Sequence, residues 1–245
     1  MASSPPEKTV TVDPAVAELF TRIETNFQTT ALGPESWYLL VIACLSGSPD
    51  PELADQLYLH VINQPNSATS AARQKFIRRL REALVKCVSI VGCCKPIEAI
   101  LAISQVEQDE DRDYSMTRQD WNCDADNHAR ATEWFRAIYA RDGKSTLGLF
   151  DAHRDFQWLS TEITYGLYLS DRQVLDDTET EIVVLASIMI QNLRKETWWH
   201  IRGTRRIGVS KQDTQVLWDC IQLVAEFFEI KLNKVPTVDQ VEEDV

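Results

Sequence analysis

The sequence predicts an all-α protein, and three observations support this fold class. Apolar residues recur every three or four positions, which places them on one face of a helix. No segment alternates apolar and polar residues as a half-buried strand does. Only 8 glycines occur in 245 residues, and the single hairpin-type dipeptide, Asp142-Gly143, lies between segments without alternation. We therefore expect a chain whose regular elements are helices.

The helices can be placed from their apolar spacing and from the residues that begin and end them. Asp13-Pro14 is typical of an N-cap followed by a first-turn proline, and Pro51 opens a later helix in the same way. Gly92 and Pro96 separate a long helix from a shorter one. The expected helices span residues 15–27, 34–44, 51–61, 70–88, 97–103, 127–139, 149–154, 161–169, 177–192, 196–207 and 211–228.

The rest of the chain is polar. Residues 1–13 are predicted to be a flexible tail and residues 235–245 a solvated acidic tail. Residues 105–126 are acidic and lack apolar periodicity, so we expect a plain connector or a lid. Residues 14–104 and 127–234 then form a first and a second helical repeat within one compact domain.

An internal repeat supports this division. The matched pairs are residues 35–44 with 181–190, 56–60 with 196–200, and 81–87 with 214–220. The first pair begins with glutamate, the second ends in histidine, and the third keeps a leucine and ends in cysteine. Three matches in one order predict the duplication of a three-helix unit, which would bury two equivalent faces around a pseudo-two-fold axis.

Charge and composition exclude several classes of protein. The 25 Lys and Arg against 37 Asp and Glu give a net charge of −12, whereas a general nucleic-acid binder or a protein on anionic lipid needs a basic face. No apolar run approaches the roughly 18–20 residues of a membrane span. The N-terminus lacks the hydrophobic core of a signal peptide. We therefore expect a cytoplasmic protein without nucleic-acid or membrane partners.

The six cysteines do not suggest a disulfide framework in a chain of this length. Cys87 and Cys220 fall inside apolar helices and are predicted to be core residues. Cys93 and Cys94 are adjacent, which fits neither a zinc site nor a redox pair. Neither a metal nor an organic cofactor is expected.

Glu181, Glu196 and His200 form the constellation best suited to chemistry. Glu196 and His200 are four residues apart and share a helix face, so the carboxylate can orient the imidazole and tune its pKa. Glu181 begins the preceding helix, and a buried carboxylate there would act as an acid. The same spacing also suits an ordinary helix salt bridge, with Glu181 stabilising a helix dipole. The spacing does not suit a di-metal bundle.

Aromatic and polar residues near this constellation are candidate substrate contacts. The stretch 153–168 is rich in aromatic side chains with polar tips, and it contains His153, Trp158 and Tyr165. Such residues line pockets, anchor interfaces or fill cores, and the sequence leaves these three alternatives open. Trp199 neighbours the imidazole and is expected to desolvate it, and Arg202 follows two residues after His200.

The pattern Glu181…Glu196-x-x-x-His200-x-x-Gly203…Gly208-Val-Ser resembles the carboxymuconolactone decarboxylase and alkylhydroperoxidase-like family. Residues 79–99 resemble the closing helices of the same module, and together the likeness covers residues 33–103 and 160–232. It is closest to two-copy members common in filamentous fungi. The resemblance implies two family-type helical repeats, a homo-oligomer (dimer or trimer) formed through the core helices, and a role in secondary metabolism.

The resemblance also implies which of the family's two branches, peroxidase or decarboxylase, this chain is more similar to. The peroxidase branch carries Cys-x-x-Cys-x-x-x-His with a glutamate 19 residues before the histidine, and Glu181 and His200 keep that spacing. Leu193 and Glu196 stand at the two cysteine positions, so disulfide exchange is expected to be lost. The decarboxylase branch has a glutamate four residues before the histidine, as Glu196 is here. In the first copy, Gln56 replaces that glutamate, so this copy is expected to be structural.

Our first hypothesis is therefore a cofactor-independent enzyme acting on a small cyclic acid, lactone or β-keto compound. Decarboxylation, isomerisation or elimination would proceed through an enolate, with His200 as acid or base, Glu196 orienting it and Glu181 relaying a proton or holding a substrate hydroxyl. Arg202, Tyr165 or His153 would stabilise the oxyanion.

Two other classes of function remain open. A catalytically silent scaffold for dimerisation or partner binding predicts a buried His200 without a cavity beside it. A thiol-dependent peroxidase predicts an accessible cysteine of low pKa next to a base.

Overall fold

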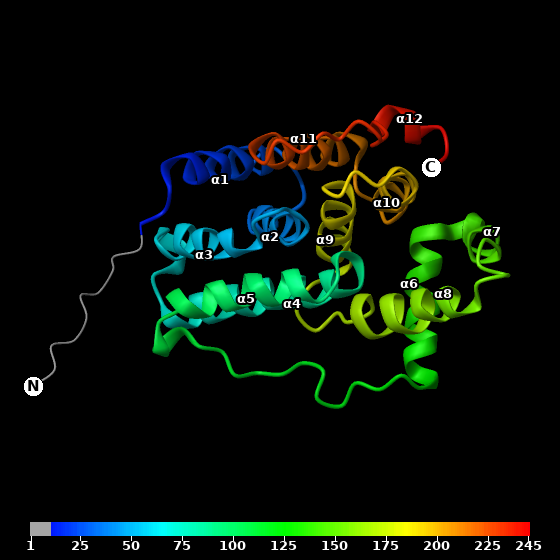
Figure 1. Ribbon diagram of the computed structural model, residues 1–245, viewed down its shortest axis with the longest axis horizontal. Coiled ribbons are helices and arrows are strands. Elements are labelled where there is room, and N and C mark those ends of the chain that lie inside the picture. The colour runs from blue at the N-terminus through cyan, green and yellow to red at the C-terminus, as the bar shows by residue number, and fades with distance from the viewer. Residues whose placement is uncertain (1–10) are drawn as a thin grey trace, which may run out of the picture.

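The computed structural model describes residues 11–245, and every regular element in this part of the chain is a helix (Figure 1), so the all-α prediction is confirmed. The α-helices are α1 (Pro14–Phe27), α2 (Trp37–Gly47), α3 (Ala54–Ile62), α4 (Ser70–Val91), α5 (Cys94–Val106), α6 (Ala125–Tyr139), α7 (Gly143–Gly148), α8 (Arg154–Trp158), α9 (Asp177–Met189), α10 (Arg194–Arg206), α11 (Lys211–Phe227) and α12 (Val238–Glu242). Four short 3₁₀ turns are η1 (Pro51–Leu53), η2 (Pro65–Ser67), η3 (Asp109–Asp111) and η4 (Ala140–Asp142), and η5 (Leu159–Leu169) is a π-helix. Within residues 11–245, no helix has the length and apolarity needed to cross a membrane.

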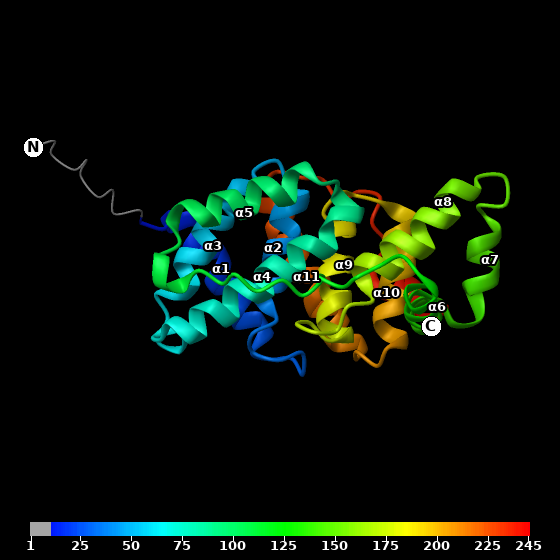
Figure 2. The ribbon, with the colours of Figure 1, turned by 90° about the horizontal axis from the view of Figure 1, so that it is seen from below.

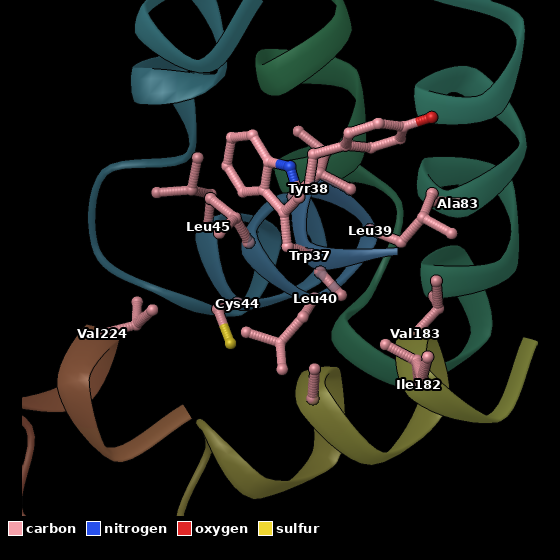
Figure 3. Packing of buried hydrophobic residues seen from close by; sticks show 14 of the residues in the cluster. Trp37, Tyr38, Leu39, Leu40, Cys44, Leu45, Ala83, Ile182, Val183 and Val224 are labelled. Atoms are coloured by element: carbon pink, nitrogen blue, oxygen red, sulfur yellow. The ribbon is translucent and has the colours of Figure 1, made fainter. Parts of the chain in front are cut away.

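Helices α2 and α9 cross at the centre of the core. Both are apolar around most of their circumference, which is the pattern of a fully buried helix. Figure 3 shows Leu40 of α2 between the two sides of this core, with Ile182 and Val183 of α9 on one side and Cys44 turned towards Val224 of α11 on the other. Gly47 allows the close approach, because a Cβ atom there would lie 2.4 Å from Ile190 Cγ2.

The remaining helices cover this crossing. α4 packs against both α2 and α9, α10 covers α9, and α1 lies beside α11 on one side of the molecule (Figure 1). α6 packs against η5 and α10 at the far end, next to the short α7 and α8 (Figure 2). The matched repeat segments fall on α2 and α9, on α3 and α10, and on α4 and α11. The two members of the first pair are the helices that cross.

Two expected features of the chain are wrong. The acidic end is not a solvated tail, because Val238 and Val241 of α12 are both fully buried and Glu242 pairs with Arg205 at 2.9 Å. The two valines, three positions apart, lie on the face by which this short helix docks. The helix expected over 149–154 is instead the turn between α7 and α8.

The N-terminal tail is described only in part. Residues 1–10 of the predicted flexible tail lie outside the described residues. Asp13 caps α1 as expected, since its side chain accepts a hydrogen bond from the amide of Ala15 at 2.8 Å.

The acidic connector is tied down along α4. Asp111 is buried against Arg73 at 2.5 Å, and Asp113 pairs with both Arg78 and Arg81. Figure 2 shows this segment passing along α4 towards α6. The acidic residues of the connector thus neutralise a row of arginines on α4.

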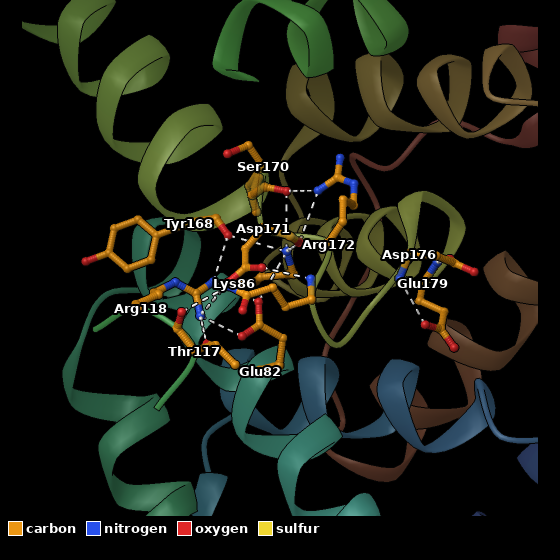
Figure 4. Close-up of polar contacts among 12 residues, drawn as sticks. Glu82, Lys86, Thr117, Arg118, Tyr168, Ser170, Asp171, Arg172, Asp176 and Glu179 are labelled. Carbon is orange, nitrogen blue, oxygen red and sulfur yellow. Dashed lines mark hydrogen bonds and ion pairs between the residues drawn. The ribbon is translucent and has the colours of Figure 1, made fainter. Parts of the chain in front are cut away.

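A buried ion cluster joins the connector, α4 and the end of η5 (Figure 4). Arg118 of the connector donates to both carboxylate oxygens of Glu82, at 2.6 and 2.7 Å. Lys86 has no exposed surface, lies 3.3 Å from Glu82 Oε1, and donates to the backbone carbonyls of Leu169 and Asp171 at 3.3 and 2.8 Å. Burial lowers the pKa of Lys86 to about 8. The cluster fixes the end of the helix that carries Tyr165.

We expect Gly47→Ala to destabilise the fold by about 1–3 kcal/mol, because the new methyl group would overlap Ile190 where α2 and α9 cross. Chemical denaturation measures the effect. Gly148→Ala is the matched control, since the nearest atom to its Cβ would be 3.9 Å away, in Asp151. An equal loss of stability in the two variants would contradict the tight crossing.

Lys86 predicts a pH dependence of stability. The folded chain releases the Lys86 proton near pH 8, whereas the unfolded chain keeps it up to about 10.5, so the unfolded state binds more protons in this window. The free energy of unfolding of the wild type, relative to Lys86→Met, should therefore rise with pH between about 8 and 10.5, by at most about 1.4 kcal/mol per pH unit. If the free energy of unfolding of the two proteins changed with pH in the same way, the assignment of a buried Lys86 that is charged below pH 8 would be refuted.

Candidate functional site

A carboxylate and an imidazole meet between α9 and α10. They belong to Glu181 and His200, which we call the dyad. His200 Nδ1 lies 2.7 Å from Glu181 Oε1, which is a short hydrogen bond. Glu181 is completely buried and His200 is 5% exposed. The pair is 19 residues apart in sequence and comes from two packed helices, so the fold itself assembles it.

The local sequence explains why these two side chains face each other. Asp176 and Glu179 form a capping box that starts α9, and Glu181 then lies one turn into the helix on its buried side. Gly203 lets α10 approach closely, since a Cβ atom there would lie 2.7 Å from Ile138 Cγ2 and 3.4 Å from Glu181 Oε1. The glycine three residues after His200 therefore has a packing role beside the dyad.

Two tyrosines extend the dyad. The Tyr165 hydroxyl lies 3.5 Å from His200 Nε2 and donates a hydrogen bond to the Tyr139 hydroxyl at 3.1 Å. The Tyr139 ring also packs edge-on against His200 and Trp199. Burial raises the pKa of both tyrosines, so both hydroxyls stay protonated and remain hydrogen-bond donors. The polar chain thus runs Glu181–His200–Tyr165–Tyr139.

Glu181 is a buried carboxyl group with a raised pKa and, among the described residues, one oxygen without a partner. Burial raises the pKa of its carboxyl group, while His200 opposes the shift. Its second oxygen, Oε2, is buried without a hydrogen-bond partner among residues 11–245. An unpartnered buried oxygen is costly unless the group holds a proton or meets a ligand. The arrangement therefore suits a group that accepts and returns a proton.

The prediction that Glu196 orients His200 is wrong. Glu196 lies in the exposed first turn of α10 and makes no hydrogen bond or ion pair with His200 in the described part of the chain. Helical spacing places the two residues on neighbouring sides, but His200 turns inward onto α9 while Glu196 points to solvent. Glu181 takes the orienting role instead.

Of the other predicted substrate contacts, all of them within residues 11–245, only Tyr165 lies against His200. Tyr165 joins the dyad, and Trp199 packs half-buried against Tyr139. His153 and Trp158 are exposed at the two ends of α8, away from His200. Arg202 is buried and forms an ion pair with Asp142 at 3.1 Å, so its guanidinium does not contact His200.

The imidazole is enclosed. The surface cavities described for residues 11–245 have volumes of about 390 to 620 Å³, and neither Glu181 nor His200 lines any of these five. Of the three predicted catalytic residues, Glu181 and His200 meet beneath Tyr139 and Tyr165, and Glu196 does not join them.

The matched segment of the first half does not build a second dyad. Glu35 is exposed and pairs with Lys75 at 2.9 Å. His60 packs edge-on against Phe20 and Trp37, and burial lowers its pKa. No carboxylate contacts this imidazole within residues 11–245, and its Nε2 has no hydrogen-bond partner there. The structural role of the first copy stays a prediction.

None of the cysteines in residues 11–245 contacts Glu181 or His200. Cys87 and Cys220 are fully buried, as predicted, and burial raises the pKa of these thiols to about 11 and about 12. Cys93, Cys94 and Cys123 are exposed and lie on other elements. Within residues 11–245, no three His, Cys, Asp or Glu side chains are grouped closely enough to hold a metal ion.

Tyr139 is the site residue that sequence reasoning missed. It ends the helix correctly predicted over 127–139, but no motif distinguished it from an ordinary core aromatic. Its four-residue spacing from Phe135, against which its ring stacks, was the available signal.

Comparisons with known proteins add one distant relative. No family model matches the chain, and no solved structure matches it. The chain is similar to Peroxisomal protein 2 of Schizosaccharomyces pombe, with 22% identity over 158 residues. The matched part covers 61% of this chain and 73% of that protein.

The buried dyad predicts a specific NMR signal. The Nδ1 proton shared by His200 and Glu181 should give a strongly downfield, slowly exchanging resonance, because the pair is shielded from water. Glu181→Gln should remove this signal and lower stability by about 1–3 kcal/mol. Glu196→Gln is the exposed control and should change neither. Persistence of the signal in Glu181→Gln would contradict the assigned hydrogen bond.

Proposed function

We propose that the protein is an acid–base enzyme that needs neither metal nor organic cofactor, of the carboxymuconolactone decarboxylase-like kind. The observation that carries the proposal is the buried Glu181–His200 hydrogen bond of 2.7 Å, with the unpartnered Glu181 Oε2 behind it. The proposed substrates are small cyclic acids, lactones or β-keto compounds, which react through an enolate by decarboxylation, isomerisation or elimination.

Each residue has a defined role in this proposal. Glu181 accepts from Nδ1 of His200 and so leaves Nε2 as the base that removes a substrate proton. The single proton of the Tyr165 hydroxyl, which donates to Tyr139 in the resting site, turns to the developing enolate oxygen when substrate binds beside Nε2. Tyr139 then donates to the Tyr165 oxygen and holds that hydroxyl in place. Among the three oxyanion candidates, Tyr165 is preferred because His153 is exposed and Arg202 is paired with Asp142.

The sequence resemblance supports the same residues. Glu181 and His200 keep the family spacing, and they are the two side chains that form the hydrogen bond. Leu193 and Glu196, at the cysteine positions of the peroxidase branch, are both exposed on α10 or its N-cap. Substrate entry then requires displacement of the rings over His200, of which Trp199 is half-buried.

A non-catalytic scaffold is the second candidate, and the enclosure of His200 favours it. In this alternative the dyad is a satisfied core pair, and an interface carries the function. Exposed apolar side chains on the far end of the molecule, from the turn after α7 to the start of η5, would supply a homo-oligomer contact; they are Leu149, Phe156, Trp158 and Leu159. The thiol-peroxidase alternative is disfavoured by the raised pKa of the buried thiols.

The cytosol and the peroxisome are the two proposed compartments. The first follows from the composition of the chain, and the second from the name of the yeast relative. Imaging a fluorescent fusion together with a peroxisomal marker distinguishes them.

The enzyme proposal predicts turnover that depends on His200. A panel of cyclic β-keto acids and lactones is screened by carbon dioxide release and by ultraviolet absorbance. His200→Gln should lower kcat by a factor of about 10²–10⁴ at a temperature where circular dichroism shows the variant to be folded. Its thermal unfolding midpoint should also fall, because the substitution removes the partner of the buried Glu181. Glu196→Gln should keep the wild-type rate, because that side chain is exposed. A wild type inert across the panel, or an unchanged rate in His200→Gln, would favour the scaffold.

A further inference from the structure

A second carboxylate–imidazole pair lies outside the candidate site, between α6 and η5. His128 Nδ1 is 2.6 Å from Glu162 Oε1. The imidazole is 61% exposed and its Nε2 has no partner among residues 11–245, whereas the Glu162 carboxylate is mostly buried. This pair is thus open to ligands where the Glu181–His200 pair is closed.

The surrounding fold holds Glu162 in place. η5 is an eleven-residue π-helix, a form that appears mostly as single turns and often at functional sites. The fully buried Asn127 donates to the Glu162 backbone carbonyl at 3.0 Å and approaches its Oε2 at 3.4 Å. Gly166 makes room for this amide, since a Cβ atom there would lie 2.4 Å from Asn127 Nδ2. The Glu162 carboxylate therefore meets His128 from a fixed support.

The pair opens into a cavity of about 390 Å³ between α6, α8 and η5. This volume suits a small-molecule site. One wall is apolar and is formed by Phe135, Leu147 and Trp158. Arg154 lines the same cavity, is exposed, and forms no ion pair with any residue of the described range 11–245. The cavity thus combines an oriented imidazole, an unpaired cation and an exposed aromatic ring.

We propose that this cavity binds a small carboxylic acid with an apolar body. The Arg154 guanidinium pairs with the carboxylate, for which its planar donors are suited. The apolar body packs on Trp158 and Phe135. With both ring nitrogens protonated, His128 donates from Nε2 to the ligand carboxylate and from Nδ1 to Glu162. Glu162 then opposes the anion less than a free carboxylate would, because its Oε1 pairs with the same imidazolium and its Oε2 accepts from Asn127. None of these residues belongs to the Glu181–His200 dyad, so the two proposals stand independently.

Benzoate is the probe, and the histidine Cε1–H resonances of the full chain are the readout. The chain has only 4 histidines, so the signals can be assigned by single substitutions. Benzoate should shift the His128 signal in a saturable way and leave those of His60 and His200 unchanged. Benzamide, the uncharged analogue of the same shape, should bind at least about tenfold more weakly, because it lacks the charge that Arg154 pairs with.

Two substitutions test the proposed contacts. Arg154→Gln should weaken benzoate binding by about tenfold. Arg136→Gln removes an exposed arginine of α6 that does not line the cavity, and it should leave binding unchanged. Thermal unfolding midpoints confirm that the variants are folded.

Three outcomes would overturn the proposal. They are the absence of a saturable His128 shift, equal affinity for benzoate in Arg154→Gln and the wild type, and equal affinity for benzoate and benzamide in the wild type. A benzoate-dependent shift at His200 alone would place the ligand at the dyad instead, and would count for the acid–base site while refuting this one.

Discussion

The crossing of α2 and α9 is the constraint on which the other elements depend. Residues 37–46 of α2 and 180–189 of α9 are all buried, so beyond the acidic first turn of α9 both helices require neighbours around their whole circumference. Gly47 leaves room for Ile190 where the two helices meet, and α4, α10, α11 and α1 pack around them. A carboxylate in the middle of such a helix cannot reach solvent. The burial of Glu181 follows from where α9 must lie.

That burial decides the chemistry of the site. A lone carboxylate in an apolar core is unfavourable by several kcal/mol, roughly 3–5 when a buried partner is lost. The imidazole of His200 offsets this for one oxygen of Glu181, and Oε2 is left without a partner. Tyr165 and Tyr139 surround the imidazole with neutral donors, and burial keeps the pKa of Glu181 raised although His200 and Arg172 oppose the shift. Glu181 is thus left incompletely satisfied, which is the property that the proposed proton exchange uses.

The sequence predicted what depends on local pattern and missed what depends on tertiary contact. Apolar spacing located the long helices, because each long helix presents an apolar face to the core. It missed α12, where Val238 and Val241 stand among acidic residues. Four-residue spacing joined Glu196 to His200, but spacing along one helix does not say which side faces the core. The pairing of Arg118 with Glu82, 36 residues apart, likewise exists only after the connector has docked.

The two glutamate–histidine pairs differ in exposure but share a support. Glu162 and Tyr165 both lie on η5, so the π-helix that anchors the open pair also carries the hydroxyl next to the closed one. The end of η5 is held by the Lys86 cluster and its middle by Asn127. At 3.5 Å, the contact of Tyr165 with His200 is at the limit of a hydrogen bond, and such contacts weaken or strengthen with small displacements. Rigid attachment of η5 at these two points is therefore what keeps Tyr165 within reach of the imidazole.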